Sequence, residues 1–480
     1  MQMIIGGHFV DARSGQTFEI TNPATGDLIA KVPRANTDDV ALAIQSAIRG
    51  RDVMRDLPAH KRSDILRKVA DTLYTRHEEL SQLLCRENGK TIRQCRGEMT
   101  ATARLFMDFS EEAKRLRGQS IPMDAVAGLE HMIAYTIRQP LGIVTGIVPF
   151  NYPAELFAHK IPGAIAAGNA VIVKLPEQCP LTVLKIGEIM LQSGLPGDGL
   201  QMLTGFPQDL GDQLITHPEV AMISFTGGVV AARIIARQAA DLLKRTAFEL
   251  GGVDAMIVLA DADIDAAATA VVQGRLTNGA GQICCAVKQV YVAERILQPF
   301  LDKLVEKVKA IKLGSPTGED TDIGPLISEQ AAERVHREVT RSIEMGAKCL
   351  IGGQRIGKQF YAPTVLVDVS EDMPCLRDEV FGPVAPIVPF RDVHAAIRTI
   401  NATPYGLQAS VFSESIHNAL GVAHRLEVGG VVVNGAGAFR PGNVPFGGVN
   451  QSGIGVESIT DTVREMSHET AIVLNQKALG

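Results

Sequence analysis

A cysteine in a glycine-rich loop and a carboxylate upstream of it are the residues of this chain best suited to covalent chemistry. Cys284 lies in the run Gly-Gln-Ile-Cys-Cys-Ala, and Glu249 lies 35 positions earlier in Phe-Glu-Leu-Gly-Gly, where it ends an apolar stretch. A thiolate can attack a carbonyl carbon, and a nearby carboxylate can later activate the water that releases the acyl group. The two residues therefore indicate covalent catalysis on a carbonyl.

An amide and a Lys–Glu pair follow two apolar runs further upstream. Asn151 stands between two prolines after the run 143–150. Its side chain would be a rigid donor that stabilises an oxyanion by about 3–4 kcal/mol, although an Asn there can also simply satisfy its own turn. Lys174 ends another run, with Glu177 three positions later. This pair can bind ribose hydroxyls, and its carboxylate would repel a 2′-phosphate; the alternative is a solvated ion pair.

A strand-to-helix turn at Thr226, Gly227 and Gly228 offers backbone donors and a helix N-terminus to a pyrophosphate. No Gly-x-Gly-x-x-Gly motif follows a predicted strand, so an ordinary Rossmann site is not expected. With nucleotide-binding groups upstream, the thiol indicates aldehyde oxidation through a thioester.

Composition excludes several other classes of protein. The 480 residues are 46% apolar and carry a net charge of −6, which predicts large cores, more than one domain, and neither nucleic acid nor membrane as a partner. The N-terminus has no basic flank or long apolar stretch, so we expect no signal peptide. Seven cysteines without framework or metal-ligand spacing predict reduced thiols, a cytoplasmic protein and no metal site.

The order of patterns predicts an α/β fold. Residues 36–118 have the spacing of amphipathic helices, and from residue 142 short apolar runs alternate with helical stretches, with a second such series beginning near residue 255. We expect two doubly wound α/β domains plus a small β oligomerisation arm. The cofactor-binding domain would comprise residues 1–120 and 141–250, the catalytic domain 251–460, and the arm 121–140 and 461–480, with paired strands in 121–140 and 464–475.

The motifs together resemble the aldehyde dehydrogenase superfamily from about residue 5 to the C-terminus. Those that carry the resemblance, in chain order, are Pro-Phe-Asn-Tyr-Pro, Glu-Leu-Gly-Gly, Gly-Gln-Ile-Cys, Glu-Val-Phe-Gly-Pro, and Pro-Phe-Gly-Gly before Ser-Gly-Ile-Gly. Three positions depart from the family pattern: Ala232 and Gly279 replace a Gly and an Asn, and Val253-Asp254 stands where a Lys is usual. None of these departures removes a reacting group.

The resemblance implies a role for each matching residue. Cys284 is the nucleophile, with a pKa lowered by cofactor and helix termini, Glu249 activates the deacylating water, and Asn151 with the Cys284 N–H forms the oxyanion hole. Lys160 and Glu457 would pass protons from Glu249, or they form only an ion pair. NAD is the implied cofactor, with NADP as the alternative. The implied cofactor-binding residues are Val148, Pro149, Lys174, Glu177, Gly205, Thr226, Gly227, Gly228, Glu379 and Phe381.

The implied substrate tunnel favours a short aldehyde that is polar or anionic, of the semialdehyde or hydroxyaldehyde type. It is less aromatic than a pocket for fatty or benzylic aldehydes. Its residues are Tyr152, Glu155, His159, Ile283, Cys285, Phe439 and Arg440, together with Arg104 from the helix upstream. His159 with Arg440, or Arg104, could receive a carboxylate, sulfonate or phosphonate, unless the two arginines are solvated surface charges. Cys285 is either a small apolar wall or a redox partner of the nucleophile.

Three other functions stay open from the residues. In a CoA-acylating dehydrogenase CoA replaces water, but such relatives tend to lack the carboxylate at Glu249. A non-catalytic structural or binding oligomer would leave the reacting groups without a role, and a plain thiol hydrolase would leave Lys174, Glu177 and Glu379 without one. The resemblance also implies a homodimer or homotetramer.

Overall fold

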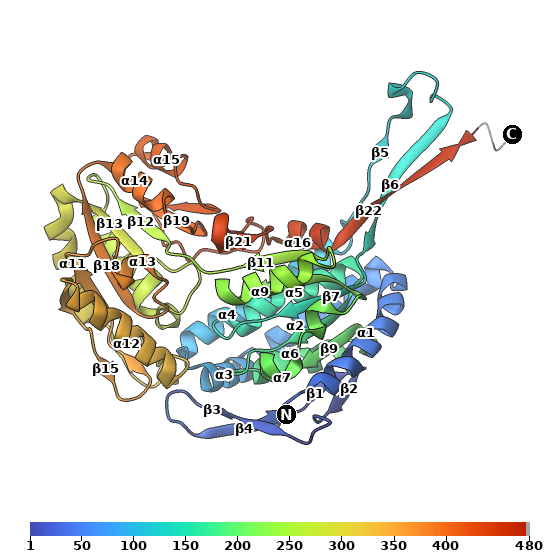
Figure 1. Ribbon diagram of the computed structural model, residues 1–480, viewed down its shortest axis with the longest axis horizontal. Helices are drawn as coiled ribbons and strands as arrows, with labels where there is room; N and C mark the ends of the chain where they lie inside the picture. Colours follow the sequence, from blue (N-terminus) through green and yellow to red (C-terminus); the bar gives the residue numbers. More distant parts are fainter. Residues whose placement is uncertain (477–480) are drawn as a thin grey trace.

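The computed structural model describes residues 1–476 and shows two helix-covered sheets and a projecting β arm (Figure 1). This arrangement confirms the predicted α/β class. Residues 477–480, which belong to the predicted arm, lie outside the described residues.

The first sheet has eight strands, of which the inner five run parallel. Its apolar strands are fully buried because helices cover both faces. The order across the sheet is β2 (His8–Val10), β1 (Met3–Ile5), β9 (Leu200–Leu203), β8 (Ala170–Lys174), β7 (Ile143–Ile147), β10 (Val220–Thr226), β11 (Arg245–Glu249) and β21 (Gly453–Ile454).

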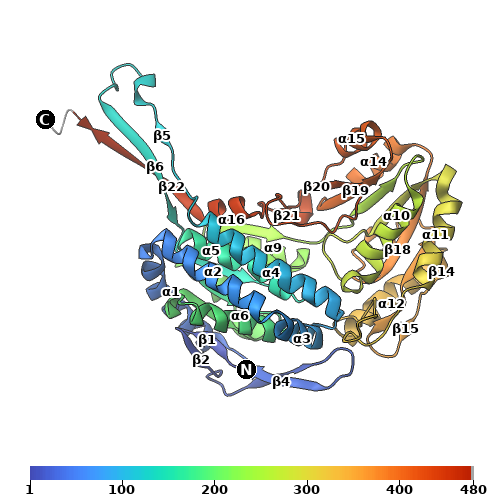
Figure 2. The same ribbon diagram turned by 180° about the vertical axis from the view of Figure 1, so that it is seen from behind.

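Seven long helices pack in the domain of the first sheet (Figure 2). They are α1 (Thr37–Asp56), α2 (Ala59–Thr75), α3 (His77–Asn88), α4 (Ile92–Glu112), α5 (Pro153–Ala167), α6 (Leu181–Gln192) and α9 (Val229–Ala240). Helix α1 begins at a capping box formed by Asn36 and Asp39. Helix α4 lies between α2 and α5, so its apolar side is buried in this core.

The second sheet has seven strands and carries the C-terminal helices. Its order is β14 (Lys348–Ile351), β17 (Thr364–Val367), β18 (Val384–Phe390), β13 (Gln289–Ala293), β12 (Ala255–Val258), β19 (Gln408–Phe412) and β20 (Gly430–Val433). Its helices are α10 (Ile264–Val271), α11 (Leu297–Lys309), α12 (Glu329–Glu344), α13 (Pro374–Arg377), α14 (Val393–Asn401) and α15 (Ile416–Ala423). Asp263 caps α10 by accepting from the Ala266 N–H, as its sequence position predicts.

The arm is a three-stranded antiparallel sheet that extends away from both domains (Figures 1 and 2). It consists of β5 (Ser120–Ile121), β6 (Met132–Pro140) and β22 (Ser467–Asn475), with β6 paired to both others. The predicted pairing of these two distant segments is therefore confirmed. A separate hairpin of β3 (Thr17–Thr21) and β4 (Leu28–Pro33) lies near the N-terminus.

Two segments lie elsewhere than the predicted boundaries place them. Strand β21, in the predicted catalytic segment, pairs with Phe248 and Glu249 of the first sheet and covers its edge. Residues 461–465, assigned to the arm, belong to helix α16 (Ile459–Glu465), which packs against α5 and α4 through a buried apolar side. The chain therefore returns to the first domain before it enters the arm.

Candidate active site

Several of the side chains singled out from the sequence lie at one edge of the first sheet, where its parallel strands end. Strand β7 leads into Asn151, β8 ends at Lys174, and β11 ends at Glu249. The register places Thr226 beside Glu249. The crevice beyond the carboxyl ends of such strands is where α/β sheets bind ligands.

Two cavities meet at Cys284 and Asn151, which line both of them. The larger is a cleft of about 500 Å³. Its other walls include Pro149, Phe150, Gln178, Thr226, Gly227, Gly228, Glu249, Gly251, Arg334, Arg337, Glu379 and Phe381. The smaller is a pocket of about 190 Å³, walled also by Tyr152, Glu155, Leu156, Asn278, Ile283, Cys285, Ala438 and Arg440. A thiol at such a junction can react with a molecule in the pocket while a second molecule occupies the cleft.

The loop that presents Cys284 has a left-handed backbone. Gly279, Ala280 and Gly281 have φ values of 56°, 51° and 73°. A Cβ on Gly281 would lie 2.3 Å from the carbonyl oxygen of Gly382, so only glycine fits there.

A buried arginine holds this loop against the segment that carries Glu379 and Phe381. The Arg275 side chain donates to the carbonyl oxygens of Val384 at 2.6 Å, Val380 at 2.8 Å and Gly281 at 3.3 Å. Three backbone carbonyls thereby satisfy a guanidinium that is almost wholly buried. Sequence reasoning missed Arg275 because nothing in its local pattern marks it as buried.

The Cys284 thiol has a pKa below its ordinary value. The hydrogen bond with the Cys285 thiol lowers it most, burial opposes this, and the charges of Arg440 and Lys288 lower it further. The same hydrogen bond, with burial, raises the pKa of Cys285 well above its usual value. Of the two thiols, Cys284 is therefore the one whose thiolate is favoured by its neighbouring side chains.

Lys288 is a second functional residue that sequence reasoning missed. Its buried ammonium donates to the carbonyl oxygen of Cys284 and to Asp254 Oδ2 at 3.1 Å, and it lies 3.3 Å from Glu379 Oε1. The departure at Val253-Asp254 was the available signal, because a buried Asp requires a cationic partner.

Glu249 faces the cleft as a nearly isolated carboxyl group. Its side chain is buried, and its Oε2 has no hydrogen-bond partner among residues 1–476. Burial raises the pKa of Glu249 well above its usual value, the charge of Glu457 adds to the shift, and Arg440 and Lys160 oppose it. A carboxyl group with a raised pKa is matched to general-base work near neutral pH.

Glu457 lies at the centre of a buried charge network beside Glu249. Lys160 Nζ donates to its Oε1 at 2.5 Å, and Arg440 Nη2 donates to its Oε2. Burial alone would raise the pKa of Glu457, but Lys160 and Arg440 outweigh it and hold the pKa at about 2. Arg440 also lies over the Phe446 ring, with Cζ 4.1 Å from its centroid.

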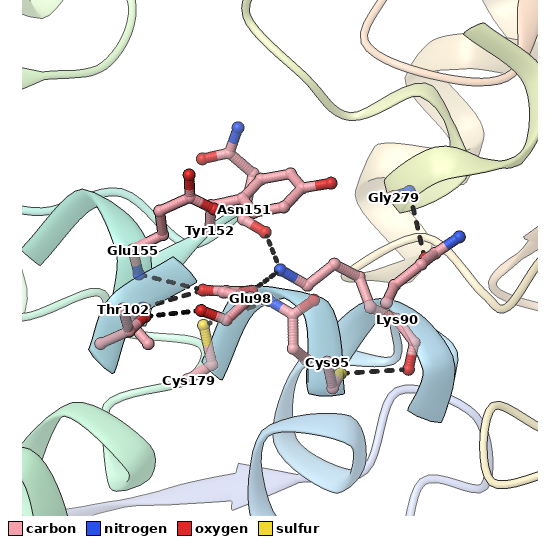
Figure 3. A network of polar contacts seen from close by, with 12 residues as sticks. Lys90, Cys95, Glu98, Thr102, Asn151, Tyr152, Glu155, Cys179 and Gly279 are labelled. Carbon is pink, nitrogen blue, oxygen red and sulfur yellow. Dashed lines mark hydrogen bonds and ion pairs between the residues drawn. The ribbon is translucent and has the colours of Figure 1, made fainter. Parts of the chain in front are cut away.

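Asn151 presents its amide away from its own turn (Figure 3). No side-chain hydrogen bond of Asn151 occurs within the described part of the chain; only its backbone carbonyl is engaged, by Lys90 Nζ at 2.7 Å. The amide is thus available to an oxyanion in the pocket.

The predicted cofactor-binding residues divide into two groups. Six line the cleft: Pro149, Thr226, Gly227, Gly228, Glu379 and Phe381. The remaining four are not among its lining residues: Val148, Lys174, Glu177 and Gly205. Among these, Lys174 Nζ donates to Glu177 Oε1 at 2.5 Å, and burial lowers the pKa of Lys174. Their neighbour Gln178 does reach the cleft.

The cleft has groups that fit a nicotinamide dinucleotide. Helix α9 begins at Gly228 without a side-chain cap, so its first N–H groups are free to bind phosphate. Thr226 Oγ1 is buried and has no hydrogen-bond partner among residues 1–476. Glu379 Oε1 is also buried, and among the same residues it has an ion pair with Lys288 at 3.3 Å but no hydrogen bond. A Cβ on Gly251 would lie 2.0 Å from Glu379 Oε2, so a glycine is required for Glu379 to lie where it does.

The predicted substrate residues are only partly brought together. Tyr152, Glu155, Ile283, Cys285 and Arg440 line the small pocket. His159 is buried behind it, with Nε2 3.8 Å from Glu155 Oε1. Phe439 is 56% exposed, and the Arg104 side chain is 74% exposed near Asp108; neither lines the pocket. Helix α4 therefore turns Arg104 to solvent.

Residues 1–476 lack two features that would indicate other kinds of site. No helix there combines the length and the apolar character needed to cross a bilayer. No group of three or more His, Cys, Asp or Glu side chains there is arranged to hold a metal ion.

Comparison with known proteins places this geometry in a family. The sequence model described as the Aldehyde dehydrogenase family matches residues 9–472. The chain belongs to the aldehyde dehydrogenase family. It is 39% identical over 463 residues to the 3-sulfolactaldehyde dehydrogenase of Priestia aryabhattai, covering 96% of each chain. It is 35% identical to the lactaldehyde dehydrogenase of Methanococcus vannielii, covering 96% of this chain and 97% of that one.

Solved aldehyde dehydrogenase structures have the same fold. An NAD-dependent aldehyde dehydrogenase from Sinorhizobium meliloti superposes with a TM-score of 0.95 at 34% identity, over 99% of this chain and 94% of that chain. An NADP-dependent enzyme from E. coli also gives 0.95, at 31% identity over 99% and 98%. This protein is thus an aldehyde dehydrogenase by family and fold, and its neighbours include users of both cofactors.

Proposed function

We propose that this aldehyde dehydrogenase uses NAD to oxidise a short aldehyde with an anionic group to the carboxylic acid. The observation that carries the proposal is the junction of the two cavities at Cys284 and Asn151, with Glu249 in the wall of the larger one.

The chain's own residues supply addition and hydrolysis. The Cys284 thiolate adds to the aldehyde carbon, and the Asn151 amide with the Cys284 N–H stabilises the resulting oxyanion. A nicotinamide in the cleft would supply the hydride acceptor that converts this thiohemiacetal to a thioester. Glu249 then removes a proton from water, which attacks the thioester, and the acid leaves as Cys284 regains its thiolate. Lys160 and Glu457 act on this base through their charges, because Glu457 raises the pKa of Glu249 and Lys160 lowers it. The ion pair with Lys160 keeps Glu457 ionised, with a pKa of about 2, so Glu457 is a poor acceptor for the proton of Glu249.

Arg440 supports an anionic substrate. It lines the pocket with Cys284, and its Nε and Nη1 are buried without hydrogen-bond partners among residues 1–476. An arginine with two unsatisfied donors, lining a pocket of about 190 Å³, favours a small carboxylate or sulfonate as the substrate's anionic group. The Priestia relative is a 3-sulfolactaldehyde dehydrogenase, and sulfolactaldehyde is an aldehyde of that kind.

Glu155 and His159 suit a hydroxyl group on the same substrate. Glu155 lines the pocket as an acceptor, and burial, with the nearby Arg440, lowers the pKa of His159 and keeps it neutral. A hydroxyaldehyde would therefore meet an acceptor on one wall and a cation on another.

Glu177 supports NAD over NADP. Its carboxylate, paired to Lys174 near the Gln178 wall, would accept from ribose hydroxyls and repel a 2′-phosphate. The fold alone does not decide the cofactor, because the two structural neighbours differ in it.

The arm supports an oligomer, and the thiols support a reducing compartment. Ile133, Tyr135, Ile137, Val473 and Leu474 expose apolar surface on β6 and β22. We therefore propose a homodimer or homotetramer built through the arm. All seven cysteines are free thiols, in keeping with the cytoplasm.

An NADH-absorbance screen tests the proposal. Short aldehydes bearing a carboxylate or sulfonate should give the highest kcat/KM, ahead of uncharged aldehydes of the same length. Product analysis with and without CoA distinguishes the rival activity: hydrolysis yields free acid in both, whereas an acyl-CoA product would contradict the role of Glu249. The Cys284→Ala variant should bind NAD and form no NADH.

A further inference from the structure

A buried ion pair lies directly behind the oxyanion donor, outside both cavities (Figure 3). Lys90, in the turn between α3 and α4, pairs with Glu98 of α4, and both side chains are almost wholly buried. Lys90 Nζ also donates to the carbonyl oxygen of Asn151 at 2.7 Å. Lys90 thus holds the backbone of Asn151, whose side-chain amide is the proposed oxyanion donor.

Glu98 binds the start of helix α5, which follows Asn151 in the chain. Its Oε1 accepts from the N–H groups of Ala154 at 2.9 Å and Glu155 at 3.3 Å. Helix α5 has no side-chain cap of its own, so Glu98 provides this cap from a different helix. Asn151 is therefore confined between a cation on its carbonyl and an anion on the helix start.

Lys90 also holds one wall of the small pocket. Its ammonium lies 3.7 Å from the centroid of the Tyr152 ring, a cation–π contact. The Tyr152 hydroxyl donates to Asn278 Oδ1 at 2.6 Å. Asn278 begins the left-handed loop that leads to Cys284.

Gln94, in the first turn of α4, binds that loop directly. Its Nε2 donates to the Thr277 carbonyl oxygen at 3.1 Å, and its Oε1 accepts from the Gly279 N–H at 3.3 Å. The start of α4 therefore contacts both the strand end that bears Asn151 and the loop that bears Cys284, which come from different domains.

The structure assigns to Lys90, Glu98 and Gln94 the role of positioning residues that hold the oxyanion donor Asn151 in register with the nucleophile loop. This inference rests on the proposed oxidation through Cys284. Its physical reason is that a misplacement of about 1 Å in a reacting group costs roughly 100-fold in rate.

A purely structural role is the competing explanation, and the chain offers a matched control for it. Glu87 is also a buried carboxylate that caps a helix, accepting from Leu181 and Thr182 N–H groups at 2.7 Å each. No hydrogen bond or ion pair joins Glu87 to Asn151 within residues 1–476. Loss of Glu87 tests helix capping alone, and loss of Glu98 tests capping together with positioning.

The test measures the pre-steady-state burst of NADH, which reports acylation, in Lys90→Met, Glu98→Gln and Gln94→Ala. We expect the burst rate to fall by roughly 10- to 100-fold in Lys90→Met, while NAD affinity and thioester hydrolysis change little. Glu87→Gln should keep its burst rate. Lys90→Met leaves a buried carboxylate unpaired, which is destabilising. If this single variant does not fold, the burst is measured in the double variant Lys90→Met/Glu98→Gln, in which both members of the pair are uncharged.

A double-mutant cycle with Asn151→Ala separates the two explanations. If Lys90 acts through Asn151, then Lys90→Met should slow the burst little further in the Asn151→Ala background. Fully additive losses, an unchanged burst in the three variants, or an equal loss in Glu87→Gln would each overturn the positioning role. A wild-type enzyme that shows no NADH burst with any aldehyde would instead overturn the proposed function.

Discussion

At the scale of residues, the two adjacent thiols at 284 and 285 are made unequal by their neighbours. The hydrogen bond between them lowers the pKa of Cys284 and raises that of Cys285, and Arg440 and Lys288 add positive charge near Cys284. Since the thiolate is the nucleophile, alkylation of Cys284 by iodoacetamide should persist at a pH below that needed for an ordinary cysteine.

Replacing the isolated carboxyl group, as in Glu249→Gln, should separate the two half-reactions. We expect a full burst of NADH followed by turnover lowered by roughly 100-fold or more, because the amide cannot accept a proton from water. Stopped-flow absorbance measures both phases. Loss of the burst together with turnover would place Glu249 in thiol activation instead.

The pH dependence of thioester hydrolysis follows from the raised pKa of Glu249. Below that pKa the carboxyl group is protonated and cannot act as a base. The hydrolysis rate of wild-type enzyme should therefore fall as the pH drops through a value well above 4.5, the ordinary pKa. A rate that stays constant down to that ordinary value would contradict the assignment.

Arg440→Gln should discriminate between substrates. The kcat/KM for an anionic aldehyde should fall by roughly 10- to 100-fold, because a charged hydrogen bond is lost. An uncharged aldehyde of equal length should lose less, because only the rise in the pKa values of Cys284 and Glu249 affects it. The control is Arg104→Gln, which changes an exposed arginine outside the pocket. Equal losses of kcat/KM for both aldehydes in Arg440→Gln would contradict an anion-binding role for Arg440.

At the scale of elements, the sequence predicted the site where it lies on regular strands and failed where charges are buried. The apolar runs that end at Lys174, Thr226 and Glu249 became strands β8, β10 and β11, so their end residues converge as expected. Lys90 and Lys288 have no such pattern, because a buried lysine looks like a surface one in sequence.

The turn between β8 and α6 should control cofactor choice. Glu177→Gln removes the negative charge but keeps the hydrogen-bonding shape, so the preference for NAD over NADP in kcat/KM should shrink severalfold. The chain contains a control of identical spacing on α6, Lys185 with Glu188 at 2.7 Å. Glu188→Gln should leave the ratio unchanged, and an unchanged ratio in Glu177→Gln as well would refute the ribose contact.

At the scale of the whole molecule, alternation in sequence was sufficient to predict the arm but not every boundary. The nine-residue strands β6 and β22 pair along their entire length, which a clear alternating pattern anticipates. Strand β21 has only two residues and α16 only seven, too short for any periodic signal. Their return to the first domain depends on tertiary packing.

Removing strand β22 tests the proposed assembly. A chain ended after Glu465 leaves β6 with an unpaired edge and exposed apolar residues. Light scattering should show a dimer or tetramer for the full chain and monomer or aggregate for the shortened one. A full-length protein that is monomeric at micromolar concentration would show that the arm does not join subunits.

The central claim is that oxidation proceeds through a thioester on Cys284, and trapping that thioester tests it most directly. Glu249→Gln enzyme is mixed with an anionic aldehyde and NAD, quenched in acid, and mapped by peptide mass spectrometry. The account predicts a mass increase equal to the acyl group on Cys284, still present when Cys285→Ala is added and absent with Cys284→Ala. An acyl group on Cys285, or NADH formed with no acylated cysteine, would contradict it.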